Sequence, residues 1–446
     1  MLFKDITIID KDFKAVRHQY VRTEGAFITY IGDADPRTIP EAGEIEGEEV
    51  YDGKNKALVP GFYNVHCHVP MTLLRGYGEG LPLQRWLFEK IFPFEAKLTP
   101  RNIQNGTLLG ALELMASGSV SISDMYFSIN EMAEALESAG MKANICHGIS
   151  SSDAEQKLTD LPGYQDTLRL SRDVRAGVYG GQKGSGEGSR IKADMGLHAE
   201  YTSTEGLVRQ IANAAKEEGL SIHVHISETE SEHRECMERH EGRTPIRYMA
   251  DCGVLDVPVQ AAHCVYLSDE DVEIMKAHGA AAVHNPSSNL KLGSGIAPVR
   301  DYLGKGLRVA LGTDGASSNN NLNMMEEIHM AAMICRGVTK DANAVSASDI
   351  LKMACLEGAK VQGRSDCGRI EKGCRADLLV FDLDRPHLQP DFDTVANIVF
   401  AAQSGDIVLN MIDGRVVYRN GEFLTLDKER VIYDANASFQ RILTEL

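Results

Sequence analysis

Alternating apolar and polar residues fill short runs at both ends of the chain. The runs DITIID and GAFITYIG lie within residues 1–57, and ADLLVFDLD and GDIVLNMIDGRVVYRNGEF lie within residues 376–446. A period of two is typical of strands that bury one face. The dipeptides Asp413-Gly414 and Asn420-Gly421 favour tight hairpin turns. We therefore predict a small β-sandwich domain built from both termini.

Residues 58–375 follow a different pattern, in which strand-like and helix-like segments alternate as in parallel α/β folds. Helical segments are expected at 101–117, 130–139, 204–218 and 242–252, among others. The eight strand candidates are ALVPGFYNVHCH, SVSISDMY, KANICHGIS, IKADMGLHAE, SIHVHISE, VQAAHCVY, AAAVHNPSSN and RVALGTDG. Eight strand–helix units favour a (β/α)8 TIM-type barrel over an open sheet. The predicted fold class is therefore α/β, with this barrel between the two β-rich ends.

Size and charge narrow the classes of function. The chain has 446 residues, which suits a barrel with an extra module. Its formal net charge of −18 disfavours nucleic acid and anionic membranes as partners, because both attract basic surfaces. No apolar run is long enough to span a bilayer, and MLFKDITIID lacks the apolar centre of a signal peptide. Nine scattered cysteines without a CxxC pair fit a reducing compartment, so we expect a cytoplasmic protein with a small-molecule substrate.

Residues that can bind metal or move protons stand at the ends of most predicted strands. In NVHCHVPMTLLRG, His66 and His68 should share one face of a strand, while Cys67 between them points to the other face. An isolated HxH motif often occurs by chance, but in this chain other strand ends carry similar residues. Other strand ends carry Asp124, His147, His198, His225 with Glu228, His263 and Asp314. The C-terminal ends of barrel strands meet at one mouth, so these side chains are expected to converge there.

Such a set of residues suits metal-assisted hydrolysis. Three imidazoles and a carboxylate can bind Zn²⁺ or a similar ion and leave room for water. The ion lowers the pKa of that water toward about 7. A proton shuttle is then needed, and Glu228 lies three residues after His225, just past its strand. The alternative is a helix cap or surface carboxylate, because SETESEHRE is rich in acids.

Several motifs, in the same order along the chain, resemble the amidohydrolase superfamily. They are His66-Cys67-His68, HISE at 225–228, AAHC at 261–264, LGTDGASSNNNL at 311–322 and GRIEKGCRADLLVFD at 368–382. They look closest to the branch of S-adenosylhomocysteine, 5'-methylthioadenosine and adenosine deaminases and of chlorohydrolases. The resemblance runs nearly from end to end. It implies a metal-dependent hydrolase barrel at 58–375, flanked by the β-sandwich parts at 1–57 and 376–446.

The resemblance also implies roles for single residues. The implied metal ligands are His66, His68, His225 and Asp314. Asp314 would also take a proton from the metal-activated water, and Glu228 would protonate the ring nitrogen beside the attacked carbon. His263 would orient the nucleophile or the developing tetrahedral centre. Two carboxylates in different environments suit this division of acid and base work.

One metal ion is expected. Binuclear relatives carry a carbamylated lysine near the C-terminal end of the fourth strand, but in IKADMGLHAE the only lysine, Lys192, lies at the other end. The ion is predicted to be Zn²⁺, with Fe²⁺ as the alternative, because histidine and carboxylate ligands suit both.

The stretches PMTLLRG at 70–76 and LPLQRWLFEKIFPFE at 81–95 resemble nucleoside deaminases in particular. Glu95 is implied to bind the ribose hydroxyls, since a carboxylate can accept hydrogen bonds from two neighbouring hydroxyls. The residues implied to face the substrate are His198, Ser318 and Trp86, although Trp86 could equally be a core residue. The implied reaction converts adenosine, 5'-deoxyadenosine, 5'-methylthioadenosine or S-adenosylhomocysteine to the inosine analogue and ammonia, by attack at purine C6.

Some alternatives stay open. The same machinery could act on a guanine-like base, a pterin or an s-triazine, and an inactive scaffold paralogue is a third hypothesis. Arg169, Arg172 and Arg175 match no motif for the 5' substituent, so the substituent is undecided. Glu200 replaces the proline of the common HAPYT, and we expect its side chain in solvent, with an inward orientation as the alternative. The resemblance also suggests a homo-oligomer.

Overall fold

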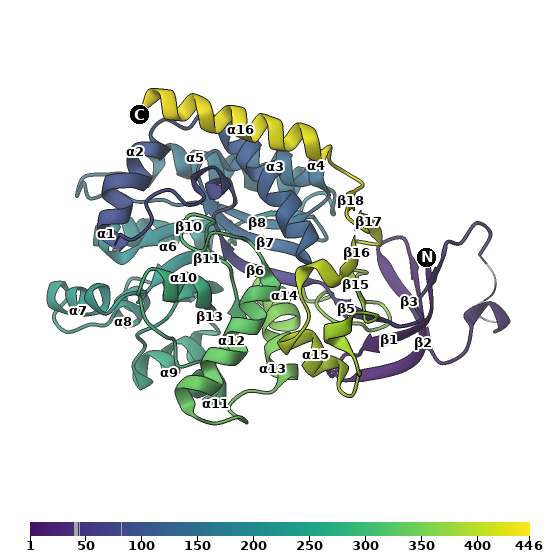
Figure 1. The fold of residues 1–446 in the computed structure, drawn as a ribbon. Coiled ribbons are helices and arrows are strands. Elements are labelled where there is room, and N and C mark those ends of the chain that lie inside the picture. Colours follow the sequence, from purple (N-terminus) through teal and green to yellow (C-terminus); the bar gives the residue numbers. More distant parts are fainter. Residues whose placement is uncertain (40–42, 44, 82) are drawn as a thin grey trace. The chain divides into compact units, whose positions relative to one another are not determined.

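The computed structural model describes residues 1–39, 43, 45–81 and 83–446, and it divides into two compact units (Figure 1). The first unit contains Met1–Tyr63, Leu112–Val120 and Asn323–Leu426. The second contains Asn64–Ala111, Ser121–Leu322 and Asp427–Leu446. The domain boundaries expected from the sequence stay a prediction.

The first unit is built around a nine-stranded sheet with strands from both termini. Its order is β18 (Glu422–Phe423), β17 (Arg415–Arg419), β16 (Ile407–Ile412), β15 (Leu378–Asp382), β5 (Lys56–Pro60), β1 (Leu2–Ile9), β2 (Ala15–Glu24) and β3 (Phe27–Gly32), and β4 (Val50–Asp52) pairs with β1. The two termini join where β5 pairs antiparallel with β15, in purple and yellow-green in Figure 1. Asp413-Gly414 and Asn420-Gly421 all have positive φ, as hairpin turns of the expected kind require. Strands from both ends of the chain thus form one sheet, as the sequence predicts.

Helices of the first unit come from its third segment. They are α12 (Met324–Thr339), α13 (Ala347–Lys352), the π-helical turn η7 (Met353–Glu357), α14 (Gly358–Val361) and α15 (Thr394–Phe400). The core of the sheet packs Phe3, Ile6, Leu58, Val380 and Leu409 against one another. Apolar burial of this kind supplies most of the stability of such a layer.

Most of the second unit is an alternation of parallel strands and helices. One sheet has the order β6 (Phe62–Cys67), β7 (Ser119–Tyr126), β8 (Lys142–His147) and β9 (Ile191–Ala193). The other has the order β10 (Met195–Ala199), β11 (Ile222–Ile226), β12 (Val259–His263), β13 (Ala281–His284) and β14 (Arg308–Leu311). Every residue of β7 and β11 is buried, which is typical of parallel strands covered on both faces.

Hydrogen bonds beyond these ladders connect the two sheets. The backbone N–H of Asp194, between β9 and β10, donates to the carbonyl of Ile145 in β8 at 3.0 Å. On the other side, the N–H of Asp314, just after β14, donates to the carbonyl of His66 in β6 at 2.9 Å. The predicted fourth strand is thus split into β9 and β10, and the eight predicted strand segments form the ring of a (β/α)8 TIM-type barrel.

The helices of the second unit follow the predicted alternation. They are α1 (Leu83–Trp86), the π-helical turn η3 (Leu87–Ile91), α2 (Phe92–Glu95), α3 (Pro100–Ala116), α4 (Ile129–Ala139), α5 (Pro162–Ala176), α6 (Glu205–Glu218), α7 (Glu230–Arg239), α8 (Pro245–Asp251), α9 (Asp269–His278), α10 (Pro286–Lys291), α11 (Val299–Gly304) and α16 (Lys428–Glu445). The expected segments 101–117, 130–139, 204–218 and 242–252 overlap α3, α4, α6 and α8. In the described part of the chain, no helix is both long and apolar enough to cross a membrane.

The C-terminal helix α16 was not foreseen from the alternating pattern that precedes it. Its buried residues Val431, Ala435, Ser438 and Ile442 recur at helical spacing. Ser438 accepts a hydrogen bond from the side-chain amide of Asn105 at 2.9 Å, so the helix docks on α3 within the second unit.

Candidate active site

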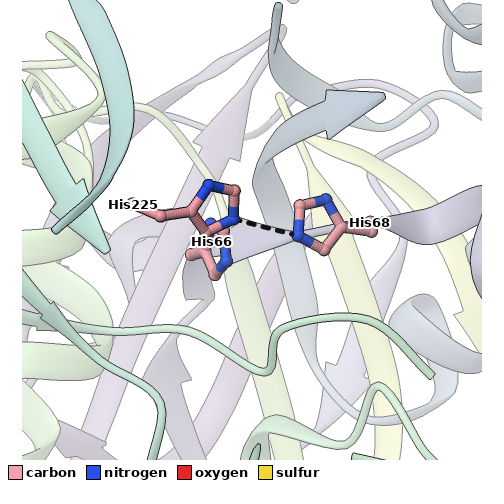
Figure 2. A group of neighbouring side chains, drawn as sticks. All are labelled: His66, His68 and His225. Carbon is pink, nitrogen blue, oxygen red and sulfur yellow. Dashed lines mark hydrogen bonds between the residues drawn. The ribbon is translucent and has the colours of Figure 1, made fainter. Parts of the chain in front are cut away.

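Three histidines from two strands point their rings at one another (Figure 2). Strand β6 carries His66 and leads into His68, and β11 carries His225. The Nε2 atoms of His68 and His225 are 3.4 Å apart, and the three residues have potential ligand atoms within 4.8 Å of one another. Cys67 is buried on the other face, where its Sγ contacts the carbonyl of Ser123, as predicted for a packing residue.

The outer nitrogen of each ring is already engaged. His68 Nδ1 lies 2.6 Å from the carbonyl of Met125, and His225 Nδ1 lies 2.6 Å from the carbonyl of His198. His66 Nδ1 lies 2.8 Å from Nε2 of His223. A ring whose Nδ1–H donates to a carbonyl presents the Nε2 lone pair on its other side. The orientation of the three rings therefore leaves their Nε2 atoms as ligands.

Burial leaves Nε2 of His66 without a hydrogen bond. A buried polar atom without a partner is costly, and a cation among these nitrogens removes that cost. The donor set, three imidazoles and a nearby carboxylate, is one that divalent transition metals prefer. The residues present therefore fit one divalent metal ion.

Asp314 follows β14 and faces the histidines. Its Oδ1 is 3.4 Å from Nε2 of His66 and 3.2 Å from Nε2 of His68. Its Oδ2 accepts hydrogen bonds from the hydroxyls of Ser288, at 2.5 Å, and Ser318, at 2.8 Å. Burial alone would raise the pKa of Asp314, but the contacts with His66 and His68 hold it well below its usual value. The carboxylate is therefore an anion at neutral pH.

Glu228 and His263 lie side by side beyond the histidine cluster. Oε2 of Glu228 is 3.8 Å from Nε2 of His263, and its Oε1 accepts a hydrogen bond from Ser294 at 3.0 Å. Nδ1 of His263 lies 2.8 Å from Oδ1 of Asn289. Burial raises the pKa of Glu228, which favours its protonated form. The surroundings of Glu228 thus favour its protonated form, whereas those of Asp314 favour the anion.

Several of these side chains sit on an unusual backbone. His263 has φ of 73°, Asp314 has φ of 61° and Ser227, next to Glu228, has φ of 51°. For residues other than glycine the left-handed region is costly, and such residues gather at functional sites. At each of these positions the chain turns sharply out of a strand, which brings the side chain over the mouth of the barrel.

Glu232, which the sequence reading did not single out, holds the backbone around Glu228. Its two carboxylate oxygens accept the N–H groups of Ser227, at 2.9 Å, and Glu228, at 2.8 Å. Thr229 and Glu232 form a capping box at the start of α7. The T-x-x-E spacing was the sequence signal for this arrangement.

One pocket joins these groups to an aromatic wall. Among the predicted site residues, its lining includes His68, Trp86, Glu95, His198, His225, Glu228, His263, Asp314 and Ser318. His66 lies behind the pocket surface and is fully buried. Burial lowers the pKa of His198 to about 4, so that ring is neutral. Trp86 is part of this lining and is only 5% exposed.

Glu95, the last residue of α2, lines the pocket and contacts a tyrosine that was not predicted from the sequence. The hydroxyl of Tyr126, at the end of β7, donates to Oε1 of Glu95 at 2.6 Å. Burial raises the pKa of Glu95 to about 7. The second oxygen, Oε2, is left for another donor.

Two strand-end residues from the sequence do not line this pocket. Asp124 accepts the backbone N–H of Val69 at 2.6 Å and so fixes the turn that follows His68. His147 packs edge-on against Phe127, with ring centroids 5.5 Å apart. Asp124 thus acts on the backbone after His68, and His147 contacts the lining residue Phe127.

The three arginines of α5 also lie away from the pocket lining. Arg175 pairs with Glu218 at 3.1 Å, and Arg169 lies 3.8 Å from Asp166. The guanidinium of Arg172 donates to the carbonyl of Leu168 in its own helix.

The expectation for Glu200 is wrong. Its side chain is only 3% exposed and lies neither in solvent nor in the pocket lining. It binds Arg239 and His240 at the end of α7, each at 2.6 Å. These charge-assisted contacts offset the cost of burying the carboxylate, and a sequence reading could not foresee partners about 40 residues away.

Comparison with known proteins agrees with this geometry. A model of the amidohydrolase family matches residues 57–417. The chain belongs to this family. It is therefore a hydrolase that acts on carbon–nitrogen bonds.

Relatives and solved structures cover nearly the whole chain. A 5-methylthioadenosine/S-adenosylhomocysteine deaminase of Thermoanaerobacter pseudethanolicus is 38% identical over 450 aligned positions, 99% of each chain. A 5'-deoxyadenosine deaminase of Methanosarcina barkeri is 37% identical and covers 99% of this chain and 97% of its own. The crystal structure of an adenosine deaminase from Xanthomonas campestris with bound zinc superposes with a TM-score of 0.88 at 25% identity, over 99% of this chain and 98% of that one.

Proposed function

We propose that this protein is a metal-dependent aminohydrolase that deaminates an adenosine-type nucleoside at purine C6. The observation that carries the proposal is the position of Glu95, a partly buried carboxylate whose Oε1 is held by Tyr126, in the same pocket as Glu228, His263 and Asp314. A ribose offers two neighbouring hydroxyls to such a carboxylate, whereas a free base, a pterin or a triazine offers none. The names of the relatives support the same class of substrate.

The residues proposed to hold the metal are His66, His68, His225 and Asp314. We propose a single Zn²⁺ ion, which the ligand types and the zinc-bound structural relative support. When bound, the ion acts as a Lewis acid and lowers the pKa of water to about 7.

The protein's own groups then divide the proton transfers. Asp314, an anion anchored by two serine hydroxyls, accepts the proton that water loses as its oxygen bonds to C6. Glu228, whose pKa is raised, gives its proton to the adjacent ring nitrogen. His263, oriented by Asn289, supports the new oxygen substituent. The C6–N bond breaks as the amino group takes up the proton that Asp314 holds, and ammonia leaves. The hydroxyl at C6 returns a proton to Glu228, and the inosine analogue remains.

The side chains that bind the nucleoside hold its C6 atom beside these proton-transferring groups. Glu95 accepts hydrogen bonds from the ribose hydroxyls, and Tyr126 fixes its orientation. Trp86 offers an aromatic face to the purine, and His198 and Ser318 line the same space. Holding reactants in the reacting geometry contributes several kcal/mol to rate enhancement.

An ammonia-release screen across purine nucleosides, purine bases, pterins and s-triazines tests this function. Turnover of adenosine-type nucleosides well above the other classes is expected. Turnover of a base or triazine with none for nucleosides would replace the proposal by the other-ring hydrolase. No turnover together with no tightly bound metal would favour the inactive paralogue.

Removal of the metal gives a second expected result. Prolonged chelation should abolish activity and lower the Tm, because a ligand that binds only the folded state stabilises it. Zn²⁺ should restore both, and elemental analysis should find about one ion per chain, the stoichiometry expected of one such ligand set. A protein with His66→Ala should fail to regain the ion, whereas His278→Ala, far from the cluster on α9, should regain it.

Glu232→Gln tests the support of Glu228. An amide has one acceptor oxygen in place of two, so one of the N–H groups of Ser227 and Glu228 loses its partner. We expect kcat to fall about 10- to 100-fold through misplacement of Glu228, with KM and metal content little changed. The control is Glu238→Gln, an exposed position on the same helix. An unchanged kcat in Glu232→Gln would refute this positioning role.

A further inference from the structure

One wall of the pocket comes from one continuous helical segment. It consists of α1, the π-helical turn η3 and α2, and it ends at Glu95. In η3 the backbone N–H of Phe92 donates to the carbonyl of Leu87, five residues back. Such π-turns are rare and often occur at functional sites.

The side chains of this segment that reach the pocket are apolar apart from Glu95. They are Trp86, Leu87, Ile91 and Phe92, and Phe127 joins them from the end of β7. Ile91 and Phe92 precede Glu95 by four and three residues, so they neighbour it on the same helical face. The surface beside the proposed ribose-binding carboxylate is therefore apolar.

Apart from four histidines, the ionisable groups that line the pocket are carboxylic acids and tyrosines. Among the described lining residues the acids are Glu95, Glu228 and Asp314, and neither lysine nor arginine occurs among them. Arg169 and Arg175, on α5, pair with acids of their own. Arg85, outside this lining, binds Glu89 one turn along at 2.7 Å.

The position of the 5' substituent follows from the chemistry of the sugar. If Glu95 binds the 2'- and 3'-hydroxyls, C5' lies two bonds from C3' and so begins close to Glu95 and its apolar neighbours. A hydrogen, hydroxyl or alkylthio group there buries little polar surface, and sulfur packs well on aromatic rings. A carboxylate would lose water without gaining a cation, and it would lie near the negative charge of Glu95.

We infer that this pocket selects purine ribonucleosides with an uncharged 5' substituent and discriminates against 5' substituents that end in a carboxylate. The inference rests on the proposed nucleoside deaminase function and narrows its substrate class. The residues that set the preference are Ile91, Phe92 and Phe127, together with Glu95.

Three thioethers of adenosine test it: 5'-methylthioadenosine, its S-propyl homologue and S-adenosylhomocysteine. The propyl compound matches most of the length of the homocysteine chain without its charges. We expect kcat/KM for S-adenosylhomocysteine to be lower than for the propyl compound by about tenfold or more, and the propyl and methyl compounds to be similar.

Equal values for S-adenosylhomocysteine and the propyl compound would overturn the inference, while deamination itself would stand. Poor turnover of both longer compounds would also overturn it, because length and not charge would then decide. Failure of all three and of adenosine would instead refute the proposed function.

Introducing a positive charge at the wall provides the second test. Phe92→Arg adds a cation within the pocket, at a position that is already 37% exposed. It should raise the kcat/KM of S-adenosylhomocysteine relative to the propyl thioether several-fold. Phe88→Arg is the matched control, because Phe88 is 67% exposed and lies outside the lining. The same gain in both variants, or none in Phe92→Arg, would contradict the assignment of the wall.

Discussion

Replacing Glu228 with glutamine is expected to lower kcat by about 10²- to 10⁴-fold, the range that general acid–base groups contribute. Glutamine keeps the size of the side chain and can still interact with Ser294, but it has no proton to transfer. The ring nitrogen beside the attacked carbon would then receive no proton as the new bond forms. KM should change little, because the metal ligands and Glu95 are untouched.

Steady-state kinetics with adenosine or 5'-deoxyadenosine, together with metal analysis, measure this effect. The matched control is Glu230→Gln, two residues later on the exposed first turn of α7. Its kcat should equal that of the unaltered protein. If Glu228→Gln kept a normal kcat and a full complement of metal, Glu228 would not be the proton donor.

Glu95→Gln should act mainly on KM for ribonucleosides. Hydrogen bonds to a charged group contribute about 1.5–3 kcal/mol each, so we expect kcat/KM to fall about 10- to 100-fold or more. The loss should be smaller for 3'-deoxyadenosine, which lacks one of the two hydroxyls. Tyr126→Phe should weaken binding in the same direction but less, because it removes only the hydroxyl that orients Glu95.

The pH dependence of KM is an independent test of whether Glu95 binds the ribose hydroxyls. Only the ionised carboxylate accepts from both hydroxyls, and burial raises its pKa to about 7. KM for ribonucleosides should therefore rise as the pH falls through about 7, and Glu95→Gln should lose this dependence. Glu89→Gln, at an exposed position on η3, serves as the control. An unchanged KM in Glu95→Gln would refute the ribose assignment.

Local patterns predicted the barrel well, because its strands are short buried runs separated by helical periodicity. The convergence of His66, His68, His225, His263 and Asp314 also followed from position alone, since the C-terminal ends of parallel strands meet. These residues do gather around one pocket.

The residues that were missed work through contacts between distant parts of the chain. Tyr126 acts through Glu95, and His223 acts through the outer nitrogen of His66. Neither has a motif of its own. Glu200 was misread because its partners, Arg239 and His240, come from another helix. The helix α16 follows a β-rich segment, and alternation there gave no sign of a change in period.

The left-handed backbone at Ser227, His263 and Asp314 has a consequence for how this protein can evolve. Each of these positions costs of order 1–3 kcal/mol in the folded state, and glycine would relieve much of it. Glycine would also remove the side chain proposed for catalysis at two of the three positions, His263 and Asp314. Selection for heat resistance alone would therefore push the sequence toward inactive variants at these sites. Thermal adaptation with retained activity has to come from elsewhere, through changes in helix caps, loops and the terminal sheet.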